Sequence, residues 1–232
     1  MSEPDHTNVT APTPEDGPWP SEARRLAAAS LRRLSNAIID HEVDDAVLAE
    51  ITATVKHLLP RIEAGAERVH TLLAMGPGAF GSGPRQVDEP ASNGTFSDSI
   101  VSGRTNPMGI GAALELRHEE AFLTVTLGSA FEGAPGRAHG GIVAALIDEA
   151  MGFALSSSGI TAFTGRLTLT YRAPTPVGLP LEGHARVAHR QGRKLTITAE
   201  LRCGETLLAE AEALFIVVEA SHFLGQEPER NT

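Results

Sequence analysis

The residues most able to do chemistry stand together in one short segment, where a histidine and two glycines precede an apolar stretch that contains a carboxylate. The segment begins His139-Gly140-Gly141 and reaches Asp148 after a run of Ala, Ile, Leu and Val. Backbone N–H groups at a helix start, with no side chain in the way, can bind a developing negative charge. A carboxylate on an apolar helical face is costly unless it is paired or used. The pattern predicts an oxyanion hole at Gly140 and a base at Asp148.

The spacing of these groups predicts that two chains build each site. A helix rises about 1.5 Å per residue, so Gly140 and Asp148 lie about 12 Å apart along one helix. That separation is too long for both groups to act on one carbonyl carbon. Two antiparallel copies of the helix across a dimer axis would bring the glycine end of one copy to the carboxylate of the other. We therefore expect two equivalent shared sites and an inactive monomer.

The elements around this helix read as an antiparallel sheet. The helix is expected from about His139 to Ser156, and a strand pair turning at residues 118–120 precedes it. Alternating apolar residues predict a strand over 165–171 and two or three more over 181–189, 194–202 and 207–218. One long helix followed by an antiparallel meander makes an α+β layer with the sheet wrapped on the helix.

The rest of the chain divides by composition. Residues 1–20 read as a disordered tail and 21–75 as a helical N-terminal extension, with helices starting at Ser21 and near Asp44. Pro60 is expected to end or kink the second helix. Residues 76–105 read as a Gly/Pro/Ser-rich linker, 106–220 as the main domain and 221–232 as a C-terminal tail. We expect the extension to be a packing appendage that covers a dimer rather than a partner-binding module.

Composition excludes several classes of protein. The formal net charge of −10 argues against general nucleic-acid binding, although cationic residues gather in the second half of the chain. The single cysteine, Cys203, permits no internal disulfide and fits a reducing cytoplasm. No apolar run is long enough for a spanning helix, and the first residues lack the pattern of a signal peptide.

The residues from Phe131 to Gly141, followed by Leu146-Ile147-Asp148, resemble the hot-dog-fold acyl-CoA thioesterases. The similarity is to the branch that includes human thioesterase superfamily member 4, and more distantly to the bacterial phenylacetate-pathway thioesterases. It covers about residues 106–218, and residues 1–105 have no assigned counterpart. The resemblance implies a hot-dog fold, in which an antiparallel β-sheet wraps a long central helix, here with an N-terminal helical extension.

The resemblance also implies a role for each matching residue. Asp148 would be the catalytic carboxylate, acting as general base on water or as direct nucleophile. The N–H of Gly140 would polarise the thioester oxygen, His139 would help hold that carbonyl, and Thr164 would orient the water or the carboxylate. The turn expected to meet the CoA moiety of the substrate consists of Gly192, Arg193 and Lys194.

Ordinary structural roles stand beside these. His139 could simply cap the helix, Asp148 could be a structural acid, Thr164 a plain strand residue, and Arg193-Lys194 a solvated hairpin tip. Some relatives carry an asparagine where this chain has Ala134, which points to a subfamily rather than to inactivity. Glu149 is the competing carboxylate, but adjacent helix positions point about 100° apart, and Asp148 matches the motif spacing.

The sequence thus predicts a cytoplasmic acyl-CoA thioesterase of lipid metabolism, a homodimer or dimer of dimers that needs no metal or redox cofactor. The alternatives are a non-catalytic acyl or acyl-CoA binding protein and a thioesterase acting on acyl-carrier-protein substrates. A hot-dog hydratase is disfavoured, because relatives of that kind need a histidine where this chain has Phe153. The amphipathic stretch from Val47 to Leu59 also suggests a lid over the acyl tunnel.

Overall fold

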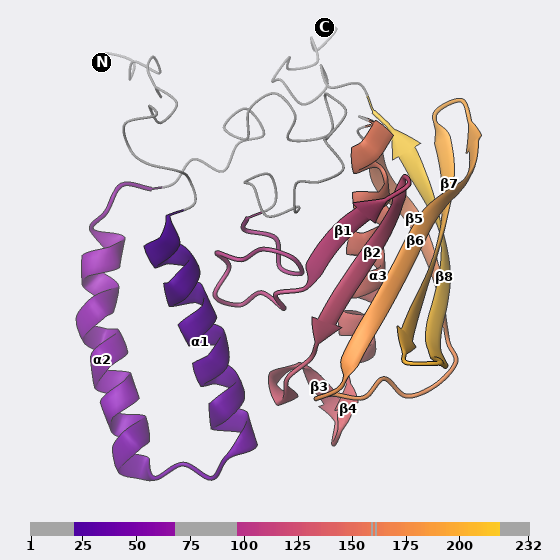
Figure 1. The fold of residues 1–232 in the computed structure, drawn as a ribbon. Helices are drawn as coiled ribbons and strands as arrows, with labels where there is room; N and C mark the ends of the chain where they lie inside the picture. Colours follow the sequence, from indigo (N-terminus) through magenta and orange to yellow (C-terminus); the bar gives the residue numbers. More distant parts are fainter. Residues whose placement is uncertain (1–20, 68–96, 159, 161, 219–232) are drawn as a thin grey trace, which may run out of the picture.

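The helix α3 (Gly140–Ala154) lies against one face of a six-stranded sheet in the computed structural model of the chain (Figure 1). The structure describes residues 21–67, 97–158, 160 and 162–218. Seven residues of α3 are buried, among them Leu146, Ile147 and Met151, which are all at most 2% exposed. Burial of these large apolar side chains against the sheet is the main force that holds the helix there.

The sheet is antiparallel throughout, as the alternating sequence predicts. Its order is β1-β2-β6-β7-β8-β5, so β5 and β1 form its edges. A small second sheet of β3 and β4 follows the 3-10 turn η3 and leads into α3, and the 3-10 turn η4 (Ser156–Ser158) follows it. The bounds are β1 Ala113–Arg117, β2 Glu120–Thr126, η3 Ser129–Phe131, β3 Glu132–Ala134, β4 Arg137–Ala138, β5 Ala162–Tyr171, β6 Pro180–Gln191, β7 Lys194–Cys203 and β8 Thr206–Val217.

Period-two burial in the strands positions the core between the sheet and α3. In β7, Leu195, Ile197 and Leu201 are each at most 1% exposed and Ala199 is 8% exposed, whereas the residues that alternate with these four are only partly buried. Ala209, Ala213 and Phe215 continue the same buried layer in β8. The predicted helix and strands are confirmed, with ends that move by up to three residues.

The two N-terminal helices are also present. The helix α1 (Glu22–Asp40) is capped by the Ser21 hydroxyl, and α2 (Asp45–Glu63) by the Asp44 carboxylate, as their sequence suggests. Pro60 does not end α2, which continues one turn further to Glu63. None of the helices in the described part of the chain combines the length and the apolar character needed to cross a membrane.

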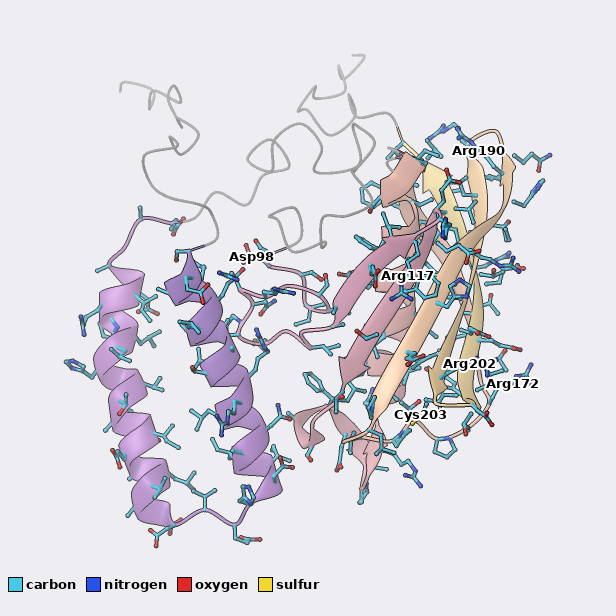
Figure 2. The ribbon with its side chains drawn as sticks, in the orientation of Figure 1. Asp98, Arg117, Arg172, Arg190, Arg202 and Cys203 are labelled. Atoms are coloured by element: carbon cyan, nitrogen blue, oxygen red, sulfur yellow. The ribbon has the colours of Figure 1, made fainter. Side chains whose placement is uncertain are left out.

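The helix α1 is tied to the main domain by side chains. Arg32 donates to the carbonyls of Arg104 (3.3 Å) and Asn106 (2.7 Å), and its partial burial lowers its pKa. Asn36 accepts a hydrogen bond from the N–H of Ala130 (3.1 Å), the middle residue of η3. The segment that precedes β1 in the sequence lies between α1 and β1 in space, and Asp98 is labelled on it (Figure 2).

The end of the expected linker packs on the main domain. Val101 is 2% exposed and belongs to the same apolar cluster as α3, and Thr105 is 4% exposed. The Thr105 hydroxyl donates to the Ser97 carbonyl (2.6 Å) and contacts the Asp98 carboxylate (2.7 Å). Residues 97–105 therefore pack against the main domain, which their polar composition does not reveal in the sequence.

Candidate active site

The start of α3 carries a free backbone donor beside a capping histidine. His139 is the N-cap of α3, and its Nδ1 accepts a hydrogen bond from the N–H of Gly141 (3.0 Å). A neutral imidazole that accepts at Nδ1 carries its proton on Nε2, so the ring presents an N–H donor. The N–H of Gly140 has no hydrogen-bond partner among the described residues. These two donors could both bind one oxygen atom that gains negative charge.

Tyr171 lies against the same helix start. Its hydroxyl donates to the carbonyl of Gly140 (2.8 Å). A Cβ atom at Gly140 would lie only 3.0 Å from that hydroxyl oxygen, so the close approach depends on the missing side chain. The sequence pattern alone does not assign Tyr171 to the site. The available signal was its alternation with Leu167 and Leu169, which puts Tyr171 on the face of β5 that packs against α3.

Asp148 is held from the other end of the same strand. The hydroxyl of Thr164 donates to Oδ1 of Asp148 (2.8 Å), and no other described residue donates to this carboxylate. Asp148 is half-buried in the single chain, although its apolar neighbours in sequence suggest a deeper position. The chain thus brings together two of the predicted site residues, Asp148 and Thr164.

A bulge in β5 explains why Thr164 reaches Asp148. The register of β5 with β8 shifts between Thr164 and Arg166, so that Gly165 is an extra residue in β5. In a regular strand, residues 165, 167, 169 and 171 would share one face. The extra residue places Thr164 on that face instead, toward α3. Bulges commonly redirect a side chain in this way next to functional sites.

Glu149, the competing carboxylate, points away from Asp148. It accepts hydrogen bonds from the hydroxyls of Ser99 (2.8 Å) and Ser102, both in the segment that precedes β1. The Ser99 hydroxyl in turn accepts from the N–H of Val101 (3.1 Å). Glu149 therefore anchors its own chain, while one carboxylate oxygen of Asp148 has no donor among the described residues.

One stripe of α3 is not covered by the sheet. Gly141 and Gly152 are exposed and Ala145 and Asp148 are half-buried, at spacings of four, three and four residues. This spacing keeps them on one helical face. All but Asp148 are small, so another helix could approach this stripe closely.

The remaining predicted residues lie elsewhere in the chain. Gly192 has φ +59° in the β6–β7 turn, and Arg193 Nε donates to the carbonyl of Val217 (3.0 Å). This turn lies at the end of the sheet away from β3 and β4, and the nearby Arg190 is at that end (Figures 1 and 2). Because β4 leads directly into α3, the turn is remote from Gly140 of the same chain.

A hollow of about 520 Å³ lies on the opposite face of the sheet and does not include the groups described above. Glu200, one of its lining residues, accepts a hydrogen bond from Arg202 Nε (2.9 Å), and this hydrogen bond lowers the pKa of the Glu200 carboxyl. No group of three metal-ligating side chains converges in the described part of the chain. The hollow is lined by Thr168, Thr170, His184, Arg186, Thr198, Ala199, Glu200, Glu210, Ala211 and Glu212.

With this geometry established, comparison with known proteins identifies the class of domain. Residues 135–210 match the thioesterase superfamily. This part of the chain is therefore similar to thioesterase superfamily domains, and the antiparallel sheet packed on α3 agrees with the predicted hot-dog fold. The match includes all of α3 and most of the sheet, and with them His139, Gly140, Asp148 and Thr164.

The similar proteins are acyl-coenzyme A thioesterases by name. The THEM4 protein of Mus musculus is 34% identical over 90 residues, which are 38% of this chain and 39% of that protein. The THEM4 protein of Bos taurus is 32% identical over 94 residues, which are 40% of this chain and 38% of that protein. The chain thus matches about two fifths of the length of these curated relatives.

A solved structure matches a larger share of the chain. It is the crystal structure of a thioesterase superfamily protein, 26% identical, with a TM-score of 0.69. The match covers 86% of this chain and 93% of that protein. Residues 97–218 are only about half of this chain, so the similarity extends into the N-terminal region, for which the sequence alone offered no counterpart.

Proposed function

We propose that this protein is an acyl-CoA thioesterase whose sites form between two antiparallel copies of α3. The observation that carries the proposal is the position of the two reactive groups on α3. Asp148 lies on the uncovered stripe, and one of its carboxylate oxygens receives no hydrogen bond from a described residue. The N–H of Gly140, which also has no partner among the described residues, lies at the start of α3. The relatives named above as acyl-coenzyme A thioesterases support the choice of substrate.

A two-fold axis would complete both sites at once. If two helices cross between Ala144 and Ala145, Gly141 of one copy faces Asp148 of the other, because both residues are equally far from the crossing point. The small residues of the stripe allow the helices to approach closely. The edge strand β5 is also open to pairing in the single chain, and Phe163 on it is 44% exposed. A homodimer, or a dimer of such dimers, would cover both features.

The reaction needs only a base, water and two donors. The carboxylate of Asp148 takes a proton from water, and the water oxygen bonds to the thioester carbon. The charge that develops on the carbonyl oxygen is stabilised by the Gly140 N–H and by His139 Nε2–H. Collapse of this intermediate breaks the C–S bond, and the sulfur leaves as the CoA thiol after it takes a proton. Attack by Asp148 itself, followed by hydrolysis of the mixed anhydride, gives the same products.

In this arrangement Thr164 holds the carboxylate in place, and the turn of Gly192, Arg193 and Lys194 would meet the CoA moiety. The turn is remote from Gly140 of its own chain and lies toward the C-terminal end of α3, the direction in which Asp148 follows Gly140 along the helix (Figure 1). A composite site uses the Asp148 end of one copy, so this position is compatible with contact to the substrate of that site. The cations would pair with CoA phosphates as surface charges.

Thiol release from a panel of short, long and aromatic acyl-CoAs tests the proposal. We expect Asp148→Asn to lower kcat about a thousandfold, because it removes the base while it keeps the shape. Glu149→Gln is the matched control, since it makes the same chemical change on the next residue, and it should retain activity.

Two outcomes would contradict the proposal. No turnover of any acyl-CoA by folded wild-type protein would favour a carrier-protein thioesterase or an acyl-CoA binding protein. Full activity in Asp148→Asn together with loss of activity in Glu149→Gln would show that Glu149, and not Asp148, is the base.

A further inference from the structure

The single tyrosine of the chain, Tyr171, contacts the peptide that joins the two glycines at the start of α3. That peptide contains the Gly140 carbonyl, which accepts from the Tyr171 hydroxyl, and the Gly141 N–H, which donates to His139 Nδ1. The two hydrogen bonds therefore act on opposite ends of one planar amide. Hydrogen bonds that share an amide in this way polarise each other.

We propose that Tyr171 is a positioning residue, which fixes the His139 tautomer and the orientation of the Gly140 N–H through the Gly140–Gly141 peptide. Its importance for catalysis rests on the thioesterase activity proposed above. Donation to the Gly140 carbonyl makes the Gly141 N–H a better donor to Nδ1 of His139. Nδ1 then stays an acceptor, and the proton stays on Nε2, where it can be donated.

The strand β5 carries both side chains that hold the reactive groups of α3 in place. Tyr171, the last residue of β5, contacts Gly140, the first residue of α3, and Thr164, near the other end of β5, contacts Asp148 in the middle of α3. One strand therefore sets both the carboxylate and the donor end of the helix. Small displacements of groups that bind a transition state lower the rate strongly. In the proposed dimer, each β5 would therefore support preorganisation in both shared sites, through Tyr171 in one and through Thr164 in the other.

Replacement of Tyr171 by phenylalanine removes only the hydroxyl. The side chain is 54% exposed, so the fold should be retained. We expect kcat to fall about tenfold with KM changed less than about twofold, because the hydroxyl orients donors and does not touch the substrate. Thr168→Val is the matched control: it removes a hydroxyl from the same strand on the opposite face of the sheet.

Nitrogen NMR of the histidine ring gives a readout that loss of stability would not mimic. In wild-type protein, His139 should show an acceptor-type Nδ1 and a protonated Nε2, with the signal assigned by its loss in His139→Gln. In Tyr171→Phe we expect the two nitrogens to become more alike, because both tautomers are then populated. Thr168→Val should leave the signal unchanged.

The outcomes separate this proposal from the proposed function. An unchanged kcat in Tyr171→Phe, a rise in KM alone, or an unchanged His139 signal would each overturn the positioning role. If the wild-type protein hydrolyses no acyl-CoA, the thioesterase proposal fails. The His139 signal still decides the structural claim in that case: a change in Tyr171→Phe supports it, and no change overturns it.

Discussion

At the scale of residues, the proposed site depends on the absence of a side chain at position 140. Gly140 leaves its N–H open and lets the Tyr171 hydroxyl approach the helix, where a Cβ would lie 3.0 Å from the hydroxyl oxygen. Gly141 has a related role, because a Cβ there would lie 3.1 Å from Nδ1 of His139. The pair of glycines therefore does more than permit a helix start: each makes room for a neighbouring polar group.

This close contact predicts coupling between Gly140 and Tyr171. We expect Gly140→Ala to lower kcat in the wild-type background, because the added methyl group displaces the tyrosine hydroxyl. The same substitution should cost less in the Tyr171→Phe background, where that hydroxyl is gone. A double-mutant cycle on kcat measures the coupling, and strictly additive effects would contradict the contact.

At the scale of elements, α3 has carboxylates with different tasks on adjacent residues. Asp148 faces the uncovered stripe, whereas Glu149 accepts from Ser99 and Ser102 and so fastens the segment before β1 to the helix. The same segment receives Arg32 from α1. Glu149 is thus linked, through this segment, to α1.

Removal of this link should destabilise the fold. We expect Glu149→Ala to lower the free energy of unfolding by about 1–3 kcal/mol, because two hydroxyl donors lose their charged acceptor. Glu149→Gln keeps one acceptor oxygen and should cost less. Urea denaturation followed by circular dichroism measures both variants, and equal stability of Glu149→Ala and wild type would argue against the link.

The sequence predicts the elements well because their periodicity is strong. Leu195, Ile197 and Leu201 alternate strictly, so β7 could be placed within one residue. The Gly165 bulge breaks this period, and nothing in the sequence alone shows that it turns Thr164 toward α3. Tyr171 was missed for a similar reason: its contact joins residues 31 positions apart, and only the fold brings them together.

At the scale of the whole molecule, the N-terminal helices leave apolar side chains uncovered in the single chain. On α2 no residue is buried, and Val55, Leu59 and Ile62 are 50%, 47% and 72% exposed. Apolar surface of this kind is typical of an interaction site. The solved structure that matches 86% of the chain therefore has a counterpart for part of the N-terminal region. Its suggested roles, a cover for a dimer or a lid over the acyl group, remain predictions.

The shared site itself can be tested by mixing two inactive variants. Asp148→Asn removes the proposed base and His139→Ala the proposed donor, and each homodimer should have little activity. If each site combines Asp148 of one copy with His139 and Gly140 of the other, half of the randomly exchanged dimers contain one intact site. An equal mixture, allowed to exchange subunits, should then recover about a quarter of the wild-type rate of thiol release. Subunit exchange is confirmed separately with differently tagged copies. Exchange without any recovered activity would contradict a site shared between two chains.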